Sequence, residues 1–199
     1  QRAGVRPGDK VLIIGAGTIG VLAANTVKSL GGEVYLADIV PERLEYARKA
    51  FGIDGTILST PSGIREADIK EITGTARVNG QEMAFGFDIC IEAVGVPSTF
   101  QSCIDGAAFG GKVVLLGVGK ENLDFNFTML QKKELNVMGS RNALKKDFLE
   151  LIDLVKRGDI NLDKIITNVY PAREAPKAFQ ELDQSGARML KVMLDFTDF

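Results

Sequence analysis

The sequence predicts an α/β fold: a doubly wound, six-stranded parallel sheet with helices on both faces, followed by C-terminal helices and a returning strand. Three observations predict it. Short apolar runs alternate with segments of helical periodicity along the chain, which is the pattern of a parallel sheet covered on both faces. A glycine-rich turn at residues 15–20 joins the first run to the first helix. Glycines also follow three later strands, where the chain would leave the same edge of the sheet.

The first strand, helix and second strand are the clearest elements. Residues 11–14 form a continuous apolar run, as expected for a strand buried on both faces. A Gly-x-Gly-x-x-Gly turn follows, and apolar residues then recur at helical spacing until glycines at 31 and 32 end the helix. Residues 33–38 read as the second strand, which ends in Asp38.

Each part of this stretch suits one part of a dinucleotide. Gly15 allows a tight turn, Gly17 lets a pyrophosphate approach the backbone, and Gly20 lets the helix pack close to the strand. The helix N-terminus offers unpaired N–H groups and a positive dipole end. Asp38, 18 residues after Gly20, can accept hydrogen bonds from the ribose hydroxyls of an adenosine. The stretch therefore predicts a Rossmann-type cofactor site, with a glycine-rich turn that binds nothing as the alternative.

Asp38 also favours NAD over NADP. A carboxylate beside the ribose repels a 2′-phosphate, and neither residue 39 nor residue 40 is basic. Arg43 falls in the first turn of the next helix, where it can stack on adenine, pair with a phosphate, or be a solvated surface arginine.

The remaining elements follow in order. A helix begins at Pro41 and ends before Gly52, since proline suits the first helical turn and glycine the end. The elements expected after it are a strand at 56–58, a helix at 64–73, a surface loop or hairpin at 74–86 around Asn79-Gly80, a strand at 87–92, a helix at 97–108, and strands at 112–116 and 135–138. Loops 15–20, 93–96, 117–119 and 139–142 should open on one edge of the sheet.

Two parts are expected along the chain. Residues 1–143 form the dinucleotide-binding domain, and residues 144–199 form a helical segment and strand that pack on it. In the second part, one apolar helix face runs through residues 148–155 and ends at Gly158. Another runs through residues 175–182 and ends at Gly186, and residues 189–194 form the last strand.

Composition narrows the class of function. A net charge of −2 over 199 residues gives no reason to expect nucleic acid or an anionic membrane as partner. There is no histidine, so the commonest general base and the commonest zinc ligand are both missing. Cys90 and Cys103 read as small buried residues. No signal peptide is visible, which makes the cytoplasm the default location. The start at Gln1 suggests a piece of a longer protein.

Several motifs occur together in a specific order. They are Val5-Arg6-Pro7-Gly8-Asp9-Lys10-Val11, the glycine turn, Asp38 with Pro41-Glu42-Arg43-Leu44, Glu92-Ala93-Val94-Gly95, Gly110-Gly111-Lys112-Val113-Val114, and Lys191-Val192-Met193-Leu194. In this order they resemble the cofactor domain of the zinc-dependent medium-chain alcohol and polyol dehydrogenases. The Gly139-Ser140-Arg141-Asn142 turn favours the sugar-alcohol or sugar-acid branch, of sorbitol or galactonate type.

The resemblance implies a set of cofactor-binding residues and no catalytic or metal-binding ones in this chain. Beside Gly15, Gly17 and Gly20, the set comprises Thr18 and Ile19 at the pyrophosphate, Asp38 and Arg43 at the adenosine, Val94 and Gly95 at the adenine-ribose side, Leu116, Gly117 and Val118 at the nicotinamide, Ser140 and Arg141 at the nicotinamide ribose or phosphates, and Lys191 at the pyrophosphate. Lys191 is equally well explained as a surface lysine.

The resemblance also implies a function. The chain would be the NAD-binding half of an enzyme that transfers hydride between a secondary alcohol, such as a polyol or sugar acid, and NAD. Zinc and the proton relay would belong to a catalytic domain missing from this chain, so the chain alone would be inactive. Members of the family dimerise near the sixth strand, which predicts a homodimer or homotetramer. The apolar residues there, Phe125, Phe127, Met129 and Leu130, either form that interface or tuck under the last helices.

Two other functions share part of the pattern. A non-enzymatic NAD-sensing module shares the glycine turn and the aspartate at the strand end. A methyltransferase that uses S-adenosylmethionine also carries an acid after its second strand, but its glycine loop usually lacks a third glycine at the position of Gly20.

Overall fold

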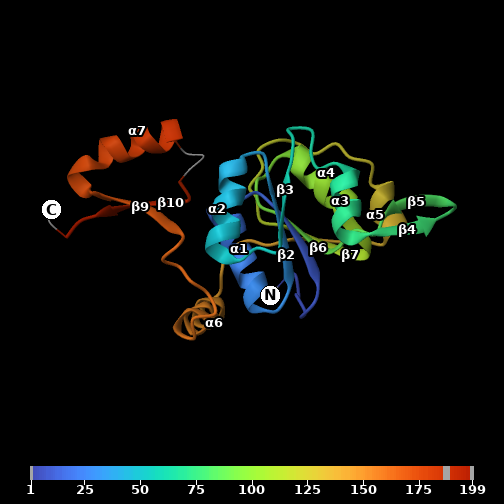
Figure 1. The fold of residues 1–199 in the computed structure, drawn as a ribbon, viewed down its shortest axis with the longest axis horizontal. Helices are drawn as coiled ribbons and strands as arrows, with labels where there is room; N and C mark the ends of the chain where they lie inside the picture. The colour runs from blue at the N-terminus through green and yellow to red at the C-terminus, as the bar shows by residue number, and fades with distance from the viewer. Residues whose placement is uncertain (1, 186–188, 198–199) are drawn as a thin grey trace.

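The chain folds around a six-stranded parallel sheet with the strand order β3-β2-β1-β6-β7-β8. The computed structural model describes residues 2–185 and 189–197. The strands of the main sheet are β1 (Lys10–Ile14), β2 (Glu33–Asp38), β3 (Gly55–Leu58), β6 (Phe87–Glu92), β7 (Ala107–Leu115) and β8 (Asn136–Gly139) (Figure 1). The strand order reverses between β1 and β6, which is where ligands bind in sheets of this kind. The predicted fold class is confirmed.

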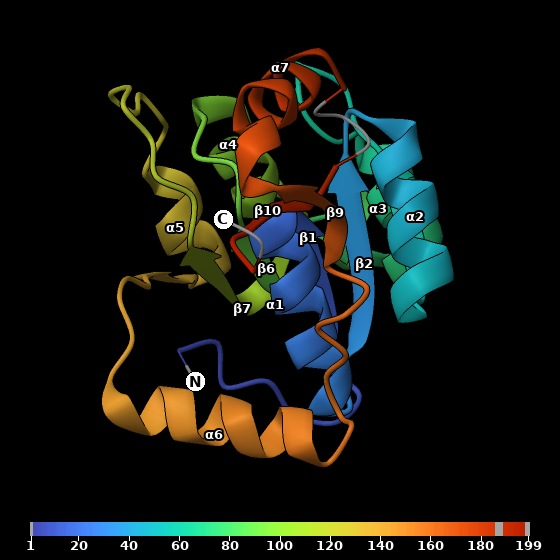
Figure 2. The same ribbon diagram turned by 90° about the vertical axis from the view of Figure 1, so that its left-hand side faces the viewer.

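Helices cover both faces of the sheet. They are α1 (Thr18–Ser29), α2 (Pro41–Phe51), α3 (Glu66–Thr73), α4 (Pro97–Gly106) and α5 (Thr128–Lys133), and a further helix, α6 (Lys145–Lys156), follows the last strand of the sheet. Buried residues of α1 and α2 share one hydrophobic cluster, and those of α3 and α4 share another. Helix α6 lies at one end of the sheet, below α1 in Figure 2.

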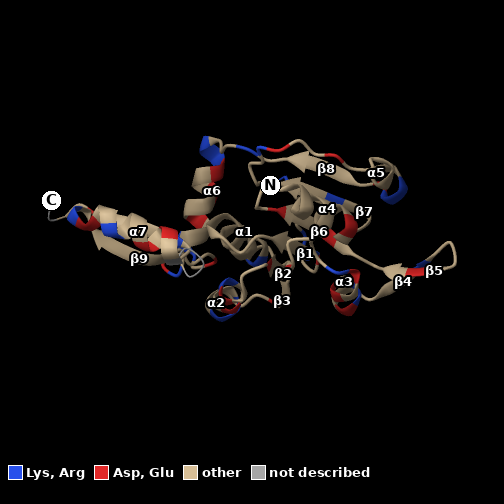
Figure 3. Ribbon diagram, turned by 90° about the horizontal axis from the view of Figure 1, so that it is seen from above, with Lys and Arg blue, Asp and Glu red and all other residues tan. Residues whose placement is uncertain are grey.

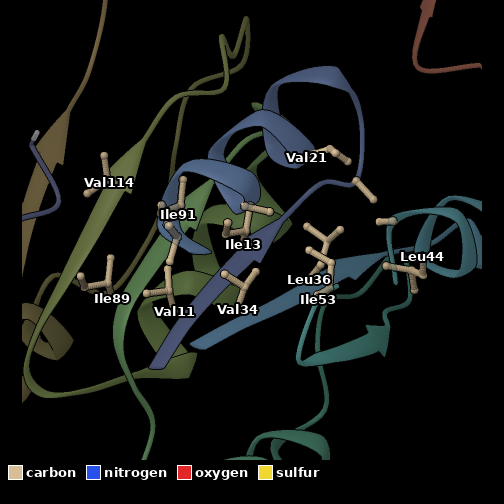
Figure 4. Close-up of a cluster of buried hydrophobic side chains, with 14 of the residues drawn as sticks. Val11, Ile13, Val21, Val34, Leu36, Leu44, Ile53, Ile89, Ile91 and Val114 are labelled. Atoms are coloured by element: carbon tan, nitrogen blue, oxygen red, sulfur yellow. The ribbon is translucent and has the colours of Figure 1, made fainter. Parts of the chain in front are cut away.

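The core explains why the first strand is apolar throughout. Val11 and Ile13 belong to the cluster under α1, whereas Leu12 and Ile14 belong to the cluster on the other face. Figure 4 shows the first cluster, to which the strands contribute together with Val21 of α1 and Leu44 of α2. Because successive strand residues point to opposite faces, a strand buried on both faces needs apolar residues at every position.

Two differences from the expected elements concern the segment 97–133. Helix α4 ends at Gly106, two residues early, and β7 begins at Ala107. The buried amino group of Lys133 donates hydrogen bonds to the carbonyl oxygens of Ile104, Asp105 and Ala107, at 2.7–3.0 Å, and this long-range cap fixes the shorter helix. Helix α5, which carries Lys133, was not predicted from the sequence.

The segment between α3 and β6 is a hairpin, which is one of the two forms expected for it, the other being a surface loop. Strands β4 (Thr75–Val78) and β5 (Gln81–Ala84) pair antiparallel and project from the body (Figure 1). Asn79 and Gly80 both have positive φ, 50° and 82°, as a tight two-residue hairpin turn requires.

The C-terminal part forms a second small sheet. Strand β9 (Ile166–Pro171) pairs parallel with β10 (Lys191–Asp195), and a short 3₁₀ turn (Ala172–Glu174) and α7 (Ala175–Ser185) connect them. The expected last strand thus pairs with β9 and stands apart from the main sheet (Figure 1). Strand β9 was not predicted, because polar residues interrupt its short apolar pattern. The helix end expected at Gly186 lies outside the described residues.

A few contacts join this part to the main body. Ile160 and Ile165 are buried, and the Tyr46 hydroxyl donates to the carbonyl oxygen of Lys164 at 2.6 Å. The Thr18 hydroxyl donates to the carbonyl oxygen of Leu190. Helix α6 forms as expected, yet none of its residues is buried, and Phe148 is 59% exposed.

The apolar residues ahead of β8 do not tuck under the last helices, which was one of the two expected alternatives, and the expected dimer interface stays a prediction. Phe125, Met129 and Leu130 pack against the second hydrophobic cluster, and the Phe125 ring meets Phe100 edge-on at 5.1 Å. Phe127 is 75% exposed.

The charged side chains lie mainly outside the sheet. Figure 3 shows both signs of charge on α2, α3, α6 and α7, while the strands of the main sheet are largely uncharged. In the described residues, no helix has the length and apolar character needed to cross a membrane.

Candidate functional site

A cavity of about 410 Å³ opens where the strand order reverses. Its walls come from the turn after β1, the end of β2, the loop after β3 and the loop between β6 and α4. It brings together five of the site residues expected from the sequence: Gly15, Gly17, Asp38, Arg43 and Val94.

The glycine turn has the shape that an anionic group needs. Gly15 has φ +107°, which favours glycine, and a Cβ atom on Gly20 would overlap the carbonyl oxygen of Gly15. Among the described residues, no atom lies within 4 Å of a Cβ atom placed on Gly17, so these residues leave space beside the backbone there. Helix α1 starts after Gly17 with no side-chain cap and no acidic residue in its first turn. Its first N–H groups are therefore available to a phosphate.

Asp38 connects this turn to the cavity. Its side chain is 8% exposed. One carboxylate oxygen accepts the Ala16 N–H at 2.7 Å, and the other accepts the Val40 N–H at 2.9 Å. The Arg43 guanidinium lies 4.0 Å from the first of these oxygens. A carboxylate has about four acceptor sites, so Asp38 can shape the turn and still accept hydrogen bonds from two hydroxyls.

Sequence reasoning missed two walls of the cavity. Ser59, Thr60, Pro61, Gly63 and Ile64 follow β3, and Ser98, Thr99 and Ser102 belong to α4. The Ser102 hydroxyl holds the two walls together, since it accepts the Ile64 N–H at 3.3 Å and donates to the Ser98 carbonyl oxygen at 2.9 Å. The rule that placed the other loops at this edge also applies to the end of β3, and it was the signal available in the sequence.

The loops after β6 and β7 lie directly against each other. A Cβ atom on Gly95, whose φ is +92°, would lie 2.7 Å from the carbonyl carbon of Val118. A Cβ atom on Gly117 would overlap the backbone nitrogen of Gly95. Leu116 is half-buried beside this contact, and Val118 is 85% exposed.

The other expected site residues fall into two groups. Ile19 is exposed in the first turn of α1. The hydroxyl of Thr18 hydrogen-bonds to Leu190, and Lys191 is the next residue along the chain. Ser140 and Arg141 instead line a second cavity of about 490 Å³, beside α6. The structure does not bring these two residues into the cavity at the glycine turn.

The described residues do not fit a metal centre. Among them, no group of three or more histidine, cysteine, aspartate or glutamate side chains could hold a metal ion. Cys90 and Cys103 are unpaired and buried, as expected, and burial raises the pKa of both thiols. A thiol held protonated in this way is a poor metal ligand.

The comparisons with known proteins agree on one family. The model of the zinc-binding dehydrogenase family matches residues 18–157. An uncharacterized zinc-type alcohol dehydrogenase-like protein of Haemophilus influenzae is 31% identical, over 96% of this chain and 53% of its own length. L-galactonate-5-dehydrogenase of Escherichia coli K12 is 29% identical, over 98% of this chain and 54% of its own length. The chain thus spans about half the length of these curated relatives.

A solved structure extends the likeness to three dimensions. It is a short chain alcohol dehydrogenase from Escherichia coli CFT073 complexed with NADH, with a TM-score of 0.84 and 25% identity over 98% of this chain and 54% of that one. The family match covers most of the chain and includes the glycine turn from Thr18 onward, Asp38 and the loops after β6 and β7. The chain belongs to the zinc-binding dehydrogenase family.

Proposed function

We propose that this chain is the NAD-binding half of a zinc-dependent oxidoreductase that transfers hydride between a secondary alcohol and NAD. The alcohol is a polyol or a sugar acid, as the likeness to L-galactonate-5-dehydrogenase suggests. The catalytic domain lies in the other half of the parent protein, in keeping with relatives about twice as long as this chain. The zinc ligands and the proton relay belong to that domain, and this chain alone is inactive.

The observation that carries the proposal is the cavity at the point where the strand order reverses. Its glycine turn leaves open space at Gly17 and uncapped N–H groups at the start of α1, which suit a pyrophosphate. Asp38 faces the same cavity and can accept hydrogen bonds from the ribose hydroxyls, with Arg43 beside it at the adenosine. Bound NAD supplies the hydride acceptor.

The remaining residues of the proposed site orient the cofactor. Val94 and Gly95 border the adenine-ribose side, and Leu116, Gly117 and Val118 flank the nicotinamide with backbone groups. Thr18, Ile19 and Lys191 serve the pyrophosphate, and Ser140 and Arg141 the nicotinamide ribose or the phosphates. The contribution of these residues is positioning, which accelerates a reaction by holding the reacting groups in alignment. Ser140 and Arg141 reach this role only if the loop after β8 moves toward the first cavity.

The test is a parallel titration of the chain with NADH, NADPH and S-adenosylmethionine by calorimetry. We expect NADH to bind more tightly than NADPH, because the Asp38 carboxylate repels a 2′-phosphate, and S-adenosylmethionine not to bind. Asp38→Ser should narrow the gap between NADH and NADPH, with Asp68→Ser as a control on α3. Absence of NADH binding at millimolar concentration would refute the proposal.

The proposal extends to organisation and location. Residues 1–143 form the NAD-binding domain, residues 144–199 form the C-terminal segment, and the parent is a cytoplasmic homodimer or homotetramer that uses no nucleic acid or membrane as partner. The rate of hydride transfer by this chain with polyols tests whether catalysis needs the other half of the parent protein. Turnover at ordinary enzyme rates would contradict the proposal that this chain alone is inactive.

A further inference from the structure

Glu92 is a buried carboxylate at the edge of the sheet where the cavity opens. It ends β6, and its side chain is 3% exposed. In the sheet it pairs with Ile14 of β1 on one side and with Leu115 of β7 on the other. A carboxylate buried at this depth is costly unless hydrogen bonds satisfy it, so its partners indicate what it stabilises.

The carboxylate holds the loop that leads from β6 into α4. A single oxygen, Oε1, accepts the Val94 N–H at 2.9 Å and the Gly95 N–H at 2.8 Å. The same oxygen accepts the Thr99 hydroxyl at 2.7 Å. Glu92 thereby fixes both the loop and the first turn of the helix that follows.

The same residue also holds the neighbouring loop. The main-chain carbonyl oxygen of Glu92 accepts the N–H groups of Leu116 and Gly117 at 2.8 and 3.0 Å. A Cβ atom on Gly117 would overlap Oε2 of Glu92, so the second loop packs directly on the carboxylate. On the other side, a Cβ atom on Gly15 would lie 2.8 Å from Cγ2 of Val94. The loop that Glu92 holds therefore contacts the glycine turn as well.

We propose that Glu92 is a positioning residue that sets the spacing between the glycine turn and the loops at 93–96 and 117–119. The inference rests on the proposed function, since these loops border the dinucleotide. Glu92 itself lines a separate cavity of about 100 Å³ together with Gly95 and Gly117. It acts on the cofactor through the backbone of Val94 and Gly95, where its hydrogen bonds end.

The experiment combines NADH titration with hydrogen exchange on the 199-residue chain. Glu92→Ala removes the acceptor, and we expect it to raise the Kd for NADH about tenfold or more, the equivalent of one lost charge-assisted hydrogen bond. Glu92→Gln keeps an oxygen acceptor and should restore most of the affinity. The amides of Val94 and Gly95 should exchange faster in Glu92→Ala, while that of Ile13 in the core changes little. Glu82→Gln, on the exposed strand β5, is the matched control.

Each outcome decides something. Unchanged NADH affinity and unchanged exchange at Val94 and Gly95 in Glu92→Ala would overturn the inference. Equal acceleration at every amide, with no rescue by Glu92→Gln, would also overturn it, because the role would then be general stability. If wild type binds no NADH, the proposed function fails, and the exchange rates still show whether Glu92 holds the loops.

A second variant covers the case in which Glu92→Ala does not fold. Thr99→Val removes the hydroxyl that donates to Oε1 of Glu92 and leaves the carboxylate in place. We expect Thr99→Val to speed exchange at the amides of Val94 and Gly95 and to raise the Kd for NADH less than tenfold, because two of the three hydrogen bonds to Oε1 remain. Unchanged exchange at both amides would contradict the role of Glu92 in holding the loop.

Discussion

At the residue scale, Gly17 and Gly20 belong to one motif and yet serve different purposes. A methyl group on Gly20 would overlap the carbonyl oxygen of Gly15, inside the fold. A methyl group on Gly17, at the start of α1, would come within 4 Å of none of the described residues. The second glycine thus serves packing, and in our proposal the first serves binding.

This difference leads to opposite expectations for two alanine variants. Gly20→Ala should lower the free energy of unfolding by about 3 kcal/mol, since backbone must move to admit the methyl group. Gly17→Ala should change it by about 1 kcal/mol or less, because Gly17 has ordinary extended dihedrals. The same Gly17→Ala should weaken NADH binding about tenfold or more, since the methyl group occupies the approach of the pyrophosphate. Urea denaturation and NADH titration of both variants provide the measurement, and equal effects of the two would contradict the assignment.

The two cysteines provide a second expectation at this scale. Both thiols are buried and burial raises their pKa, so neither forms a thiolate readily. In the native chain, a thiol-specific reagent should label neither Cys90 nor Cys103 within minutes at pH 8. In denaturant it should label both. Rapid labelling of the native chain would show that the core around β6 and α4 opens far more often than this packing implies.

Sequence reasoning identified many of the residues at the site and fewer of their bonds. A glycine turn and an aspartate at a strand end can be recognised from a few neighbouring residues of the sequence. Gly15, Gly17 and Asp38 were therefore expected at the site, and all three line the cavity. That Asp38 also accepts the Ala16 N–H, or that Glu92 joins two loops, depends on segments 22 and more residues apart. No pattern within one element carries such information.

At the element scale, the end of α1 is tied to the sheet by Asp54. The carboxylate contacts Lys28 at 2.9 Å and accepts the Val34 N–H at 2.7 Å. Burial acts to raise the pKa of Asp54, but the hydrogen bonds from Lys28 and Val34 outweigh it, so the pKa is lowered. The unfolded chain therefore binds this proton more tightly than the folded one.

The sign of the pH dependence follows from that difference. The stabilisation is present above about pH 4, the ordinary value for an aspartate, and is lost as the pH falls through the lower folded-state pKa. Asp54→Asn should lower the free energy of unfolding by about 1 kcal/mol at pH 7, a modest amount because the pair of Lys28 and Asp54 is partly exposed. Near pH 2 the substitution should change the free energy of unfolding very little. Urea denaturation of both proteins at the two pH values tests this. A penalty that stays constant with pH would show that the charge of Asp54 plays no part.

Element prediction succeeded where the pattern is local and failed where a distant group decides. The glycine after α2, Gly52, has positive φ and ends the helix where expected. The end of α4 depends on Lys133, 27 residues beyond Gly106, and strand β9 depends on pairing with β10. Both misses are cases in which tertiary contacts outweigh local preference.

At the scale of the whole molecule, apolar side chains on several outer elements remain exposed. Phe148 and Ile152 on α6, Phe179 on α7 and Val169 on β9 are all at least 47% exposed. An amphipathic helix normally turns such a face toward a partner. This is consistent with a chain that spans about half the length of its curated relatives, and with the missing half as the partner in our proposal.

The two edges of the main sheet make self-association testable. Strand β8 is one edge, and Val137 on it and Phe127 ahead of it are exposed; strand β3 is the other edge, with Leu58 exposed. An uncovered edge strand offers unpaired backbone groups to a second copy. The sequence predicts association near β8, so Val137→Lys should convert a dimer to a monomer, because a charge would be buried at the contact.

Sedimentation of the chain and its variants at tens of micromolar distinguishes association at β8 from association at β3. We expect wild type and Leu58→Lys to sediment as dimers with the same thermal midpoint. Val137→Lys should sediment as a folded monomer with a lower midpoint, because it loses the stabilisation that association gives. Both substituted side chains are exposed in the single chain. NADH affinity should also stay unchanged, since neither residue lines the cavity at the glycine turn. If Leu58→Lys alone were monomeric, the interface would lie at β3. A monomeric wild type would remove the dimer from the proposal and leave the cofactor site intact, because every group that shapes the glycine turn comes from one chain.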